Sequence, residues 1–266
     1  MRIWNKYLIQ DVKSKNVNRF EFTDQQLITD HKNYKENFKF EIFKTKKLCI
    51  KIFNFLENNL RNKETLFIGS SWGWWEYFLK DKFKVIASDV NNKYIEFHKK
   101  TKNLEYIKMN ILNLNHEKKN IYEQIVVNNI EYLFDDIQLQ KCIENVSKLS
   151  KKGTRVFVIF RSREGLVQKF IDQFLIPIET FLYYLGKKLT NNIYFIKEHY
   201  GYRRTISEFT LAWSKNNFKY LSTYEDMYEV EFKRLRIVEK LKISKILSKI
   251  FFKSSPYLNV IIFEKQ

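Results

Sequence analysis

The chain has 266 residues, of which 44% are hydrophobic and 17% aromatic, and its formal net charge is +18. This composition supports a sizeable core and excludes a chain that is disordered over most of its length. The basic excess is spread along the whole sequence rather than gathered in blocks, so we interpret it as a general compositional bias before a nucleic-acid-binding patch.

The cysteines and the N-terminal sequence limit the class of protein further. Cys49 and Cys142 lie far apart and have no metal-ligand spacing, so we expect two buried thiols and no metal site. No apolar run reaches the roughly 18–20 residues that span a bilayer, and no signal-peptide pattern precedes the first element. These features favour a cytoplasmic protein.

The first part of the chain is expected to be helical. Residues 1–44 have no clean period, and we interpret them as an N-terminal helical cap with a helix near 24–38. In residues 45–60 apolar side chains recur at helical spacing, and this pattern predicts a second helix. The side chains on its apolar face are Leu48, Ile52, Phe55, Leu56 and Leu60.

Five short apolar segments then alternate with helical segments. The predicted strands are Thr65–Ile68, Phe83–Ser88, Leu104–Lys108, Gln124–Asn128 and Thr154–Phe160. Helices are expected from about Trp74, over 92–101 and over 135–149, with Gly153 as the stop of the last one. This alternation predicts βαβ units with right-handed crossovers and a parallel sheet.

The rest of the chain mixes helices and strands. Residues 163–190 are apolar but contain Pro177, which predicts two helices that form either a lid or extra core. The later predictions are a helix over 205–217, a strand Phe218–Thr223, a helix Lys233–Phe252 and a strand Tyr257–Phe263. The helix over 233–253 is basic and amphipathic. We interpret it as cover for the sheet, and contact with an anionic membrane or RNA is the less favoured alternative.

Residues suited to ligand binding stand at the carboxyl ends of four predicted strands. They are Gly69–Gly73, Asp89, Asn110 and Asn128. Because ligands of open α/β sheets bind outside these strand ends, we expect all four at one rim. Glycines let the backbone approach a ligand, a carboxylate accepts both hydroxyls of a ribose, and an amide matches an adenine edge. The pattern predicts a nucleoside-bearing cofactor, although Asp89 is also a good helix N-cap and Asn110 a common turn residue.

Taken in order, these segments resemble the motifs of class I S-adenosylmethionine-dependent methyltransferases. The stretches LFIGSSWGWW, SDVNNKYIEF, YIKMNIL and VVNNIEYLFDD resemble the first four motifs, and FKYLST and YLNVIIFEK resemble the closing antiparallel strands. The resemblance covers about residues 45–161 and 205–264. It implies a doubly wound α/β fold with helices on both faces of a mostly parallel seven-stranded sheet. The implied strand order is 3-2-1-4-5-7-6, with strand 7 antiparallel.

The resemblance also divides the chain and assigns the cofactor. Residues 45–161 and 205–266 are expected to form a methyltransferase-like Rossmann domain, after the cap at 1–44 and around a helical lid or insertion at 162–204. The implied cofactor is S-adenosylmethionine, with Asp89 on the ribose and Asn110 and Ile111 flanking the adenine. The expected cofactor-binding residues are Gly69, Ser70, Ser71, Trp72, Gly73, Asp89, Val90, Asn110, Ile111 and Asn128.

The implied activity is direct in-line methyl transfer to the oxygen, nitrogen or carbon of a small-molecule acceptor, without a metal. The acceptor pocket is expected over the fourth and fifth strands, and the side chains predicted to face it are Asn128, Tyr132, His199 and Tyr200. The cluster from His199 to Arg204 would bind an anionic acceptor or supply a general base, although a lone histidine is more often structural. Trp75 is expected to pack its helix onto the sheet, the alternative being a cation–π contact with the positive sulfur.

Three positions depart from the family's pattern. Phe67 stands where an acidic residue is usual and removes a polar contact to the methionine amino group. Ser71 stands where a middle glycine is common and is tolerated if its φ is negative, and Asn110 replaces a common Asp. These departures motivate one alternative, a non-catalytic binding module with a decayed cofactor site. A methyltransferase that acts on RNA or lipid is another.

Overall fold

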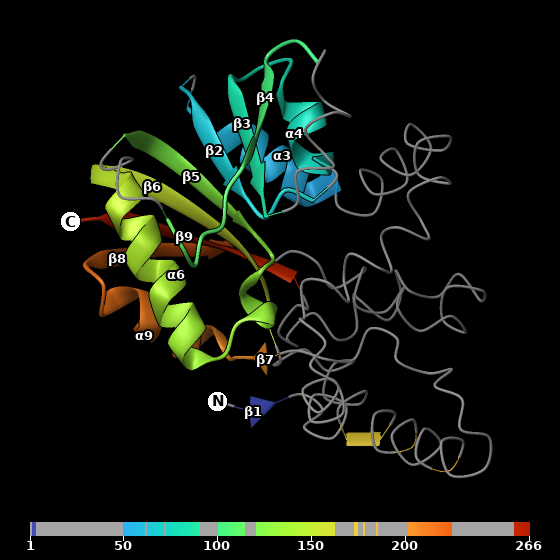
Figure 1. Cartoon of the computed structure of the whole chain (residues 1–266), viewed down its shortest axis with the longest axis vertical. Coiled ribbons are helices and arrows are strands. Elements are labelled where there is room, and N and C mark those ends of the chain that lie inside the picture. Colours follow the sequence, from blue (N-terminus) through green and yellow to red (C-terminus); the bar gives the residue numbers. More distant parts are fainter. Residues whose placement is uncertain are drawn as a thin grey trace.

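The computed structural model describes residues 2–3, 50–61, 63–71, 73–90, 101–114, 121–162, 173–174, 178, 185, 202–224 and 258–266. These residues form a seven-stranded sheet with helices on both faces and a separate two-stranded pairing (Figure 1). The helices predicted near 24–38, over 92–101 and over 233–252 lie outside the described residues, as does Cys49. No helix among the described residues is long and apolar enough to cross a membrane.

The large sheet has the topology that the sequence predicted. Its strands are β2 (Thr65–Ile68), β3 (Val85–Asp89), β4 (Leu104–Lys108), β5 (Tyr122–Asn128), β6 (Ser150–Arg161), β8 (Phe218–Tyr224) and β9 (Leu258–Lys265). Their spatial order is β4-β3-β2-β5-β6-β9-β8. β9 pairs antiparallel with β6 and β8, and the pairings from β4 to β6 are parallel. The predicted order 3-2-1-4-5-7-6, with an antiparallel strand 7, is therefore confirmed.

The central strands are buried on both faces, which explains their continuous apolar sequence. In β5, Ile125 and Val127 pack on one face and Val126 packs on the other. In β2, Phe67 is fully buried on the same face as Val126. Because successive side chains alternate between the faces, each strand contributes to two separate cores.

Two helices cover the face that carries Phe67. They are α3 (Ile50–Asn59) and α4 (Trp74–Leu79), and the predicted apolar face of α3 buries Ile52 and Leu56 completely. Trp75 packs against Phe53 of α3 with 4.3 Å between the ring centroids. It lies in one core cluster with Phe67 of the sheet, so its predicted role in packing α4 onto the sheet is confirmed. Figure 1 shows these helices and α6 on opposite sides of the sheet.

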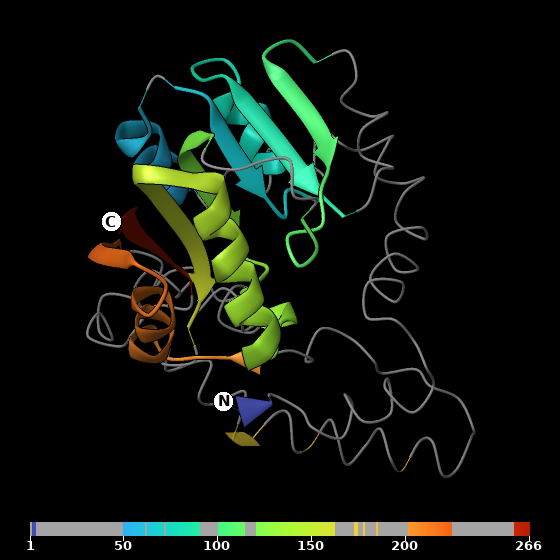
Figure 2. The same cartoon turned by 60° about the vertical axis from the view of Figure 1, so that its left-hand side comes forward.

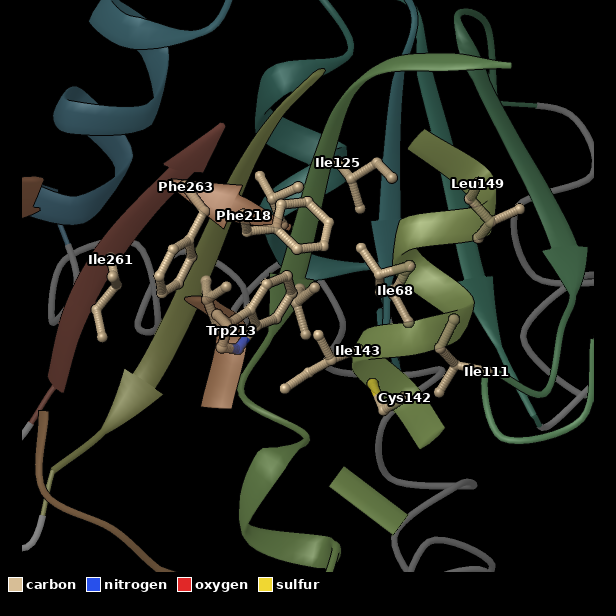
Figure 3. Packing of buried hydrophobic residues seen from close by; sticks show 14 of the residues in the cluster. Ile68, Ile111, Ile125, Cys142, Ile143, Leu149, Trp213, Phe218, Ile261 and Phe263 are labelled. Carbon is tan, nitrogen blue, oxygen red and sulfur yellow. The ribbon is translucent and has the colours of Figure 1, made fainter. Parts of the chain in front are cut away.

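The opposite face is covered by α6 (Asp136–Leu149) and α9 (Ile206–Ser214). Both helices begin at a capping box, in which Asp135 pairs with Gln138 and Thr205 with Glu208. Trp213 of α9 stacks on Phe263 of β9, with 4.9 Å between the ring centroids (Figure 3). The cysteine at position 142 is buried here as predicted, and burial raises its thiol pKa to about 12.

Gly153 was predicted to stop the helix over 135–149, and this prediction is wrong. The helix ends at Leu149, and Gly153 lies inside β6 with a φ of +78°. The β5–β6 register passes there from Tyr122↔Ser150 to Gln124↔Arg155. Gly153 therefore accommodates the left-handed backbone of an irregularity in the strand rather than a helix end.

A short pairing joins segments that are far apart in the sequence. β1 (Arg2–Ile3) pairs antiparallel with β7 (Tyr202–Arg203), and Ser162 forms a parallel bridge with Arg204. In Figure 2 these segments lie at the end of the molecule that also holds the start of α6. Ser162 and Arg204, which are described and flank segment 163–201, therefore lie side by side.

Candidate functional site

The turn after β2 is a tight backbone loop built on three residues in the left-handed region. The φ angles are +78° at Gly69, +51° at Ser71 and +70° at Gly73. The N–H groups of Gly69 and Ser70 both donate to the carbonyl oxygen of Ser88, at 2.9 Å each. These bonds fix the loop against the end of β3 before α4 begins.

Asp89 ends β3 beside this loop. Its Oδ2 accepts a hydrogen bond of 2.8 Å from the N–H of Ser71, and its carbonyl oxygen accepts one of 2.8 Å from the N–H of Met109. On the other side of the loop, Nδ2 of Asn128 donates to the carbonyl oxygen of Gly69 at 3.4 Å. The structure thus brings together the ends of β2, β3, β4 and β5, as the sequence predicted.

A serine at position 71 was expected to be tolerated only if its φ is negative, and this expectation is wrong. Its φ is positive, in a region that residues other than glycine seldom adopt. Both of its backbone polar groups are held from outside the loop. The N–H donates to Asp89, and the carbonyl oxygen accepts a hydrogen bond of 2.5 Å from the hydroxyl of Tyr106. These bonds stabilise the unfavourable conformation.

The backbone and the packing of the protein itself require a glycine at position 69, and contact of Gly69 with a cofactor remains a prediction. A Cβ at Gly69 would lie 2.1 Å from Cγ2 of Ile130 and 3.5 Å from the carbonyl oxygen of Asn128. The space that the glycine leaves is therefore taken by a side chain of the protein itself. Both the positive φ and the packing of Ile130 require a residue without a side chain here.

The two residues expected to flank an adenine differ in exposure. Asn110 is exposed, and its Oδ1 accepts from the N–H of Leu112 at 3.0 Å, which is the geometry of a turn residue. Ile111 is 4% exposed and its side chain packs in the core (Figure 3). Its carbonyl oxygen accepts from Nδ2 of Asn145 at 2.7 Å. Contact of these residues with an adenine remains a prediction.

Glu76 is the residue of this region that the sequence did not predict. It stands in the first turn of α4 and is completely buried. Burial raises the pKa of its carboxyl to about 7, the nearby Ser70 hydroxyl opposes this rise, and the charge of Asp89 adds to it. Neither carboxylate oxygen has a hydrogen-bond partner. An acidic residue in the first turn of a helix normally faces solvent. The sequence therefore gave no signal that Glu76 is buried, and only the three-dimensional packing shows it.

Beyond β5, a short 3-10 helix, η1 (Glu131–Leu133), holds the half-buried Tyr132, and contact of Tyr132 with an acceptor remains a prediction. Arg204 was part of the cluster predicted to bind an anion. Its guanidinium is buried and donates to Oδ1 of Asp136 and to the carbonyl oxygen of Phe134, each at 2.9 Å. It also donates to the carbonyl oxygen of Glu131 at 3.3 Å. Arg204 therefore holds the protein together and is not available to an anionic acceptor.

Several predicted site residues cannot be placed. Trp72, His199 and Tyr200 lie outside the described residues, so their roles remain predictions. Three large apolar side chains of the segment 163–201 are described and exposed; they are Phe174, Ile178 and Leu185. In the described part of the chain, no group of three or more His, Cys, Asp or Glu residues is placed to hold a metal ion.

Comparison of the sequence with protein-family models and with curated proteins gave no match. Solved structures match the fold. An S-adenosylmethionine-dependent methyltransferase from Methanosarcina mazei is 14% identical with a TM-score of 0.53, over 79% of this chain and 96% of that chain. Magnesium protoporphyrin IX methyltransferase from Synechocystis, with bound S-adenosylhomocysteine, is 11% identical with a TM-score of 0.53, over 84% of each chain.

A third similar structure is geranyl diphosphate C-methyltransferase from Streptomyces coelicolor, in complex with Mg²⁺, geranyl diphosphate and S-adenosylhomocysteine. It is 14% identical with a TM-score of 0.56, over 83% of this chain and 80% of that chain. The comparisons confirm that the chain has the class I methyltransferase fold. At these identities they show the fold alone, and the activity has to be argued from the site.

Proposed function

We propose that this chain is an S-adenosylmethionine-dependent methyltransferase that acts on a small-molecule acceptor. One observation carries the proposal. The carboxylate of Asp89 is hydrogen-bonded to the backbone of Ser71, so a carboxylate and a tight loop share the carboxyl edge of adjacent parallel strands. In a doubly wound sheet this edge is where nucleoside ligands bind.

The residues of the loop fit a ligand that combines a ribose with positive charge. Asp89 lies where a carboxylate can accept the ribose hydroxyls, and the buried carboxylate of Glu76 lies at the same loop without a hydrogen-bond partner. Two carboxylates at one loop would repel a triphosphate or pyrophosphate. A cationic nucleoside such as S-adenosylmethionine is therefore favoured over an anionic cofactor.

In the proposed reaction the methyl group passes directly from the cofactor to the acceptor, so the protein itself forms no covalent bond with either. When bound, S-adenosylmethionine supplies a methyl group on a positively charged sulfur, which makes that group reactive toward a nucleophile. The chain's own contribution is to orient the reactants and exclude water. The bonds from Ser71 to Asp89 and from Tyr106 to Ser71 hold the loop, and Asn128 donates to the carbonyl oxygen of Gly69 in it. Tyr132 follows β5 in η1, and both residues are proposed to face the acceptor. A general base is needed only for a hydroxyl or a protonated amine acceptor.

The proposed acceptor is a small molecule bound under the segment 162–204. Similar structures support this class by their names, which mention magnesium protoporphyrin IX, sarcosine and dimethylglycine, and geranyl diphosphate. The exposed side chains of Phe174, Ile178 and Leu185 give that segment apolar surface. An acceptor with an apolar part is therefore proposed. Contacts with RNA or a membrane through 233–253 remain less favoured predictions.

A non-catalytic binding module is the second candidate, and two observations favour it. Phe67, where an acidic residue is usual in the family, is fully buried in the core, and Ile130 fills the space beside Gly69. Such a module would bind a nucleoside weakly or not at all. Cofactor binding, followed by product formation, separates the two candidates.

The proposal is tested by calorimetric titration of the full chain with S-adenosylmethionine. We expect micromolar binding that weakens at least tenfold in Asp89→Ala and is unchanged in Asp81→Ala, whose side chain is 76% exposed after α4. Formation of S-adenosylhomocysteine with a panel of small acceptors then tests transfer itself. Equal affinity in Asp89→Ala would place the cofactor elsewhere, and binding without transfer to any acceptor would favour the binding module.

A further inference from the structure

Glu76 is a carboxylate whose surroundings are incomplete without a positive charge. Its exposed fraction is 0%, and it lies beside the Ser70 hydroxyl. Neither of its oxygens has a hydrogen-bond partner. A buried carboxylate is normally paired with a cation or hydrogen-bonded several times, because desolvation of an unpaired charge is costly.

The usual structural explanation for a glutamate at this position does not hold here. Glu76 is the third residue of α4 after the N-cap Gly73, where a glutamate often accepts from the N-cap N–H. No side-chain hydrogen bond caps this helix. The Ser70 hydroxyl lies close to the carboxylate, yet it donates to the carbonyl oxygen of Phe67 instead, at 3.4 Å. The N-cap N–H of Gly73 donates to the carbonyl oxygen of Ser70 at 2.9 Å, and the backbone N–H groups of Trp75 and Glu76 lie close enough to the carboxylate to lower its pKa, but neither carboxylate oxygen completes a hydrogen bond.

We propose that Glu76 binds the ammonium group of the methionine part of S-adenosylmethionine. This inference rests on the proposed function. The cofactor carries two positive groups, but only the ammonium has N–H donors, and it has enough of them to satisfy both carboxylate oxygens. The sulfonium has none. Glu76 then supplies from α4 the carboxylate that β2 lacks at Phe67, while Asp89 serves the ribose.

The positions of the two carboxylates support this division. Asp89 contacts the loop at the N–H of Ser71, and Glu76 lies next to Ser70 on the helix that follows. Among the described residues, Asp89 is the charged group within electrostatic reach of Glu76. Like charges this close oppose each other, and a bound ammonium would relieve that repulsion.

The test is a calorimetric comparison of Glu76→Gln with the unchanged protein, using three ligands. S-adenosylmethionine carries the ammonium and the sulfonium, S-adenosylhomocysteine only the ammonium, and 5′-methylthioadenosine neither. We expect Glu76→Gln to weaken binding of the first two at least tenfold and of the third less than twofold. The matched control is Glu57→Gln on α3, a partly exposed glutamate paired with Lys82. It should leave all three affinities unchanged.

A second measurement needs only the unchanged protein. Titration with S-adenosylhomocysteine at pH 6 in two buffers of different ionisation enthalpy should show release of about one proton, because the ammonium favours the charged form of Glu76. Glu76→Gln should abolish that release.

Three results would overturn the inference while leaving the proposed function intact. They are equal affinities in Glu76→Gln and the unchanged protein, a loss confined to S-adenosylmethionine, and an equal loss for all three ligands. If the unchanged protein binds none of the three ligands, the proposed function fails and the inference fails with it.

Discussion

Glu76 makes the stability of this fold depend on pH in an unusual direction. Its folded-state pKa, about 7, is above the ordinary value of 4.5, so the folded chain holds the proton more tightly than the unfolded chain. The contribution to stability is fully present below pH 4.5 and is lost as the pH rises to about 7. We expect this single group to lower the free energy of unfolding by roughly 3 kcal/mol across that range.

Urea unfolding at pH 5 and pH 8 measures this effect. Other groups also titrate in this range, so the comparison is between variants. The difference in unfolding free energy between the two pH values should change by roughly 3 kcal/mol in Glu76→Gln and hardly at all in Glu57→Gln. An identical pH dependence in Glu76→Gln and the unchanged protein would mean that Glu76 is paired in solution.

Two glycines with the same φ allow the cost of backbone strain to be measured separately from the cost of a packing clash. Gly69 and Gly153 both have a φ of +78°, but a Cβ at Gly153 would meet nothing within 4 Å. Gly153→Ala should therefore cost only the left-handed strain, about 1–2 kcal/mol. Gly69→Ala should cost about 1–3 kcal/mol more, because its Cβ overlaps Ile130.

A double-mutant cycle tests whether Ile130 causes the additional loss of unfolding free energy in Gly69→Ala. Ile130→Ala removes the atom that the new Cβ would meet 2.1 Å away. In that background Gly69→Ala should cost no more than Gly153→Ala does, as measured by urea unfolding. Additive effects of the two substitutions would show that Ile130 does not occupy the space beside Gly69.

At the residue scale, the sequence identified the polar groups but not their surroundings. Gly69, Asp89 and Asn128 were predicted because strand ends are visible in the hydrophobic pattern. The positive φ of Ser71 depends on Asp89 and on Tyr106, which is 35 positions away in the sequence. The burial of Glu76 likewise depends on packing that no local pattern encodes.

One buried side chain joins the segment before α9 to η1 and to the start of α6. Arg204 lies just before α9 and donates to the carbonyl oxygens of Glu131 and Phe134 and to Asp136 at the start of α6. The carboxylate of Asp136 is 58% exposed and stays solvated without its partner, but the two carbonyl oxygens would lose their donor. Arg204 therefore fixes the position of η1 and of Tyr132 on it.

We expect Arg204→Met to lower the free energy of unfolding by roughly 2–4 kcal/mol. Lys215→Met, an exposed position just beyond α9, should change it by less than 0.5 kcal/mol. Chemical denaturation measures both values. Similar values for the two variants would show that the buried guanidinium is not a structural link.

At the element scale, the hydrophobic pattern predicted the strands of the seven-stranded sheet and the helices packed on it, but not the short pairing of β1 with β7. The predicted bounds of β2 and β4 match the structure, and α6 begins and ends within one residue of its prediction. The prediction that Gly153 ends this helix was wrong, although a glycine directly after a helix commonly marks the helix end. The helix ends instead where Ser150 becomes extended, since β6 begins directly there.

At the scale of the whole molecule, the topology of the sheet was more predictable from the sequence than the surroundings of the proposed acceptor pocket. Parallel strands with buried crossovers bring their carboxyl ends to one edge, so the order of motifs was enough to predict the sheet and its rim. The acceptor side depends on segments such as 163–201, whose apolar sequence fits a lid and a core helix equally well. His199 and Tyr200 belong to that segment, and their roles remain predictions.

The central claim is that a cationic nucleoside cofactor binds at the loop between β2 and α4. A crystal structure of the full chain with S-adenosylhomocysteine tests it most directly. We predict the ribose hydroxyls on the carboxylate of Asp89, the adenine near Asn110 and the ammonium on Glu76. A ligand bound elsewhere, or crystals without ligand after growth at millimolar concentration, would contradict the claim.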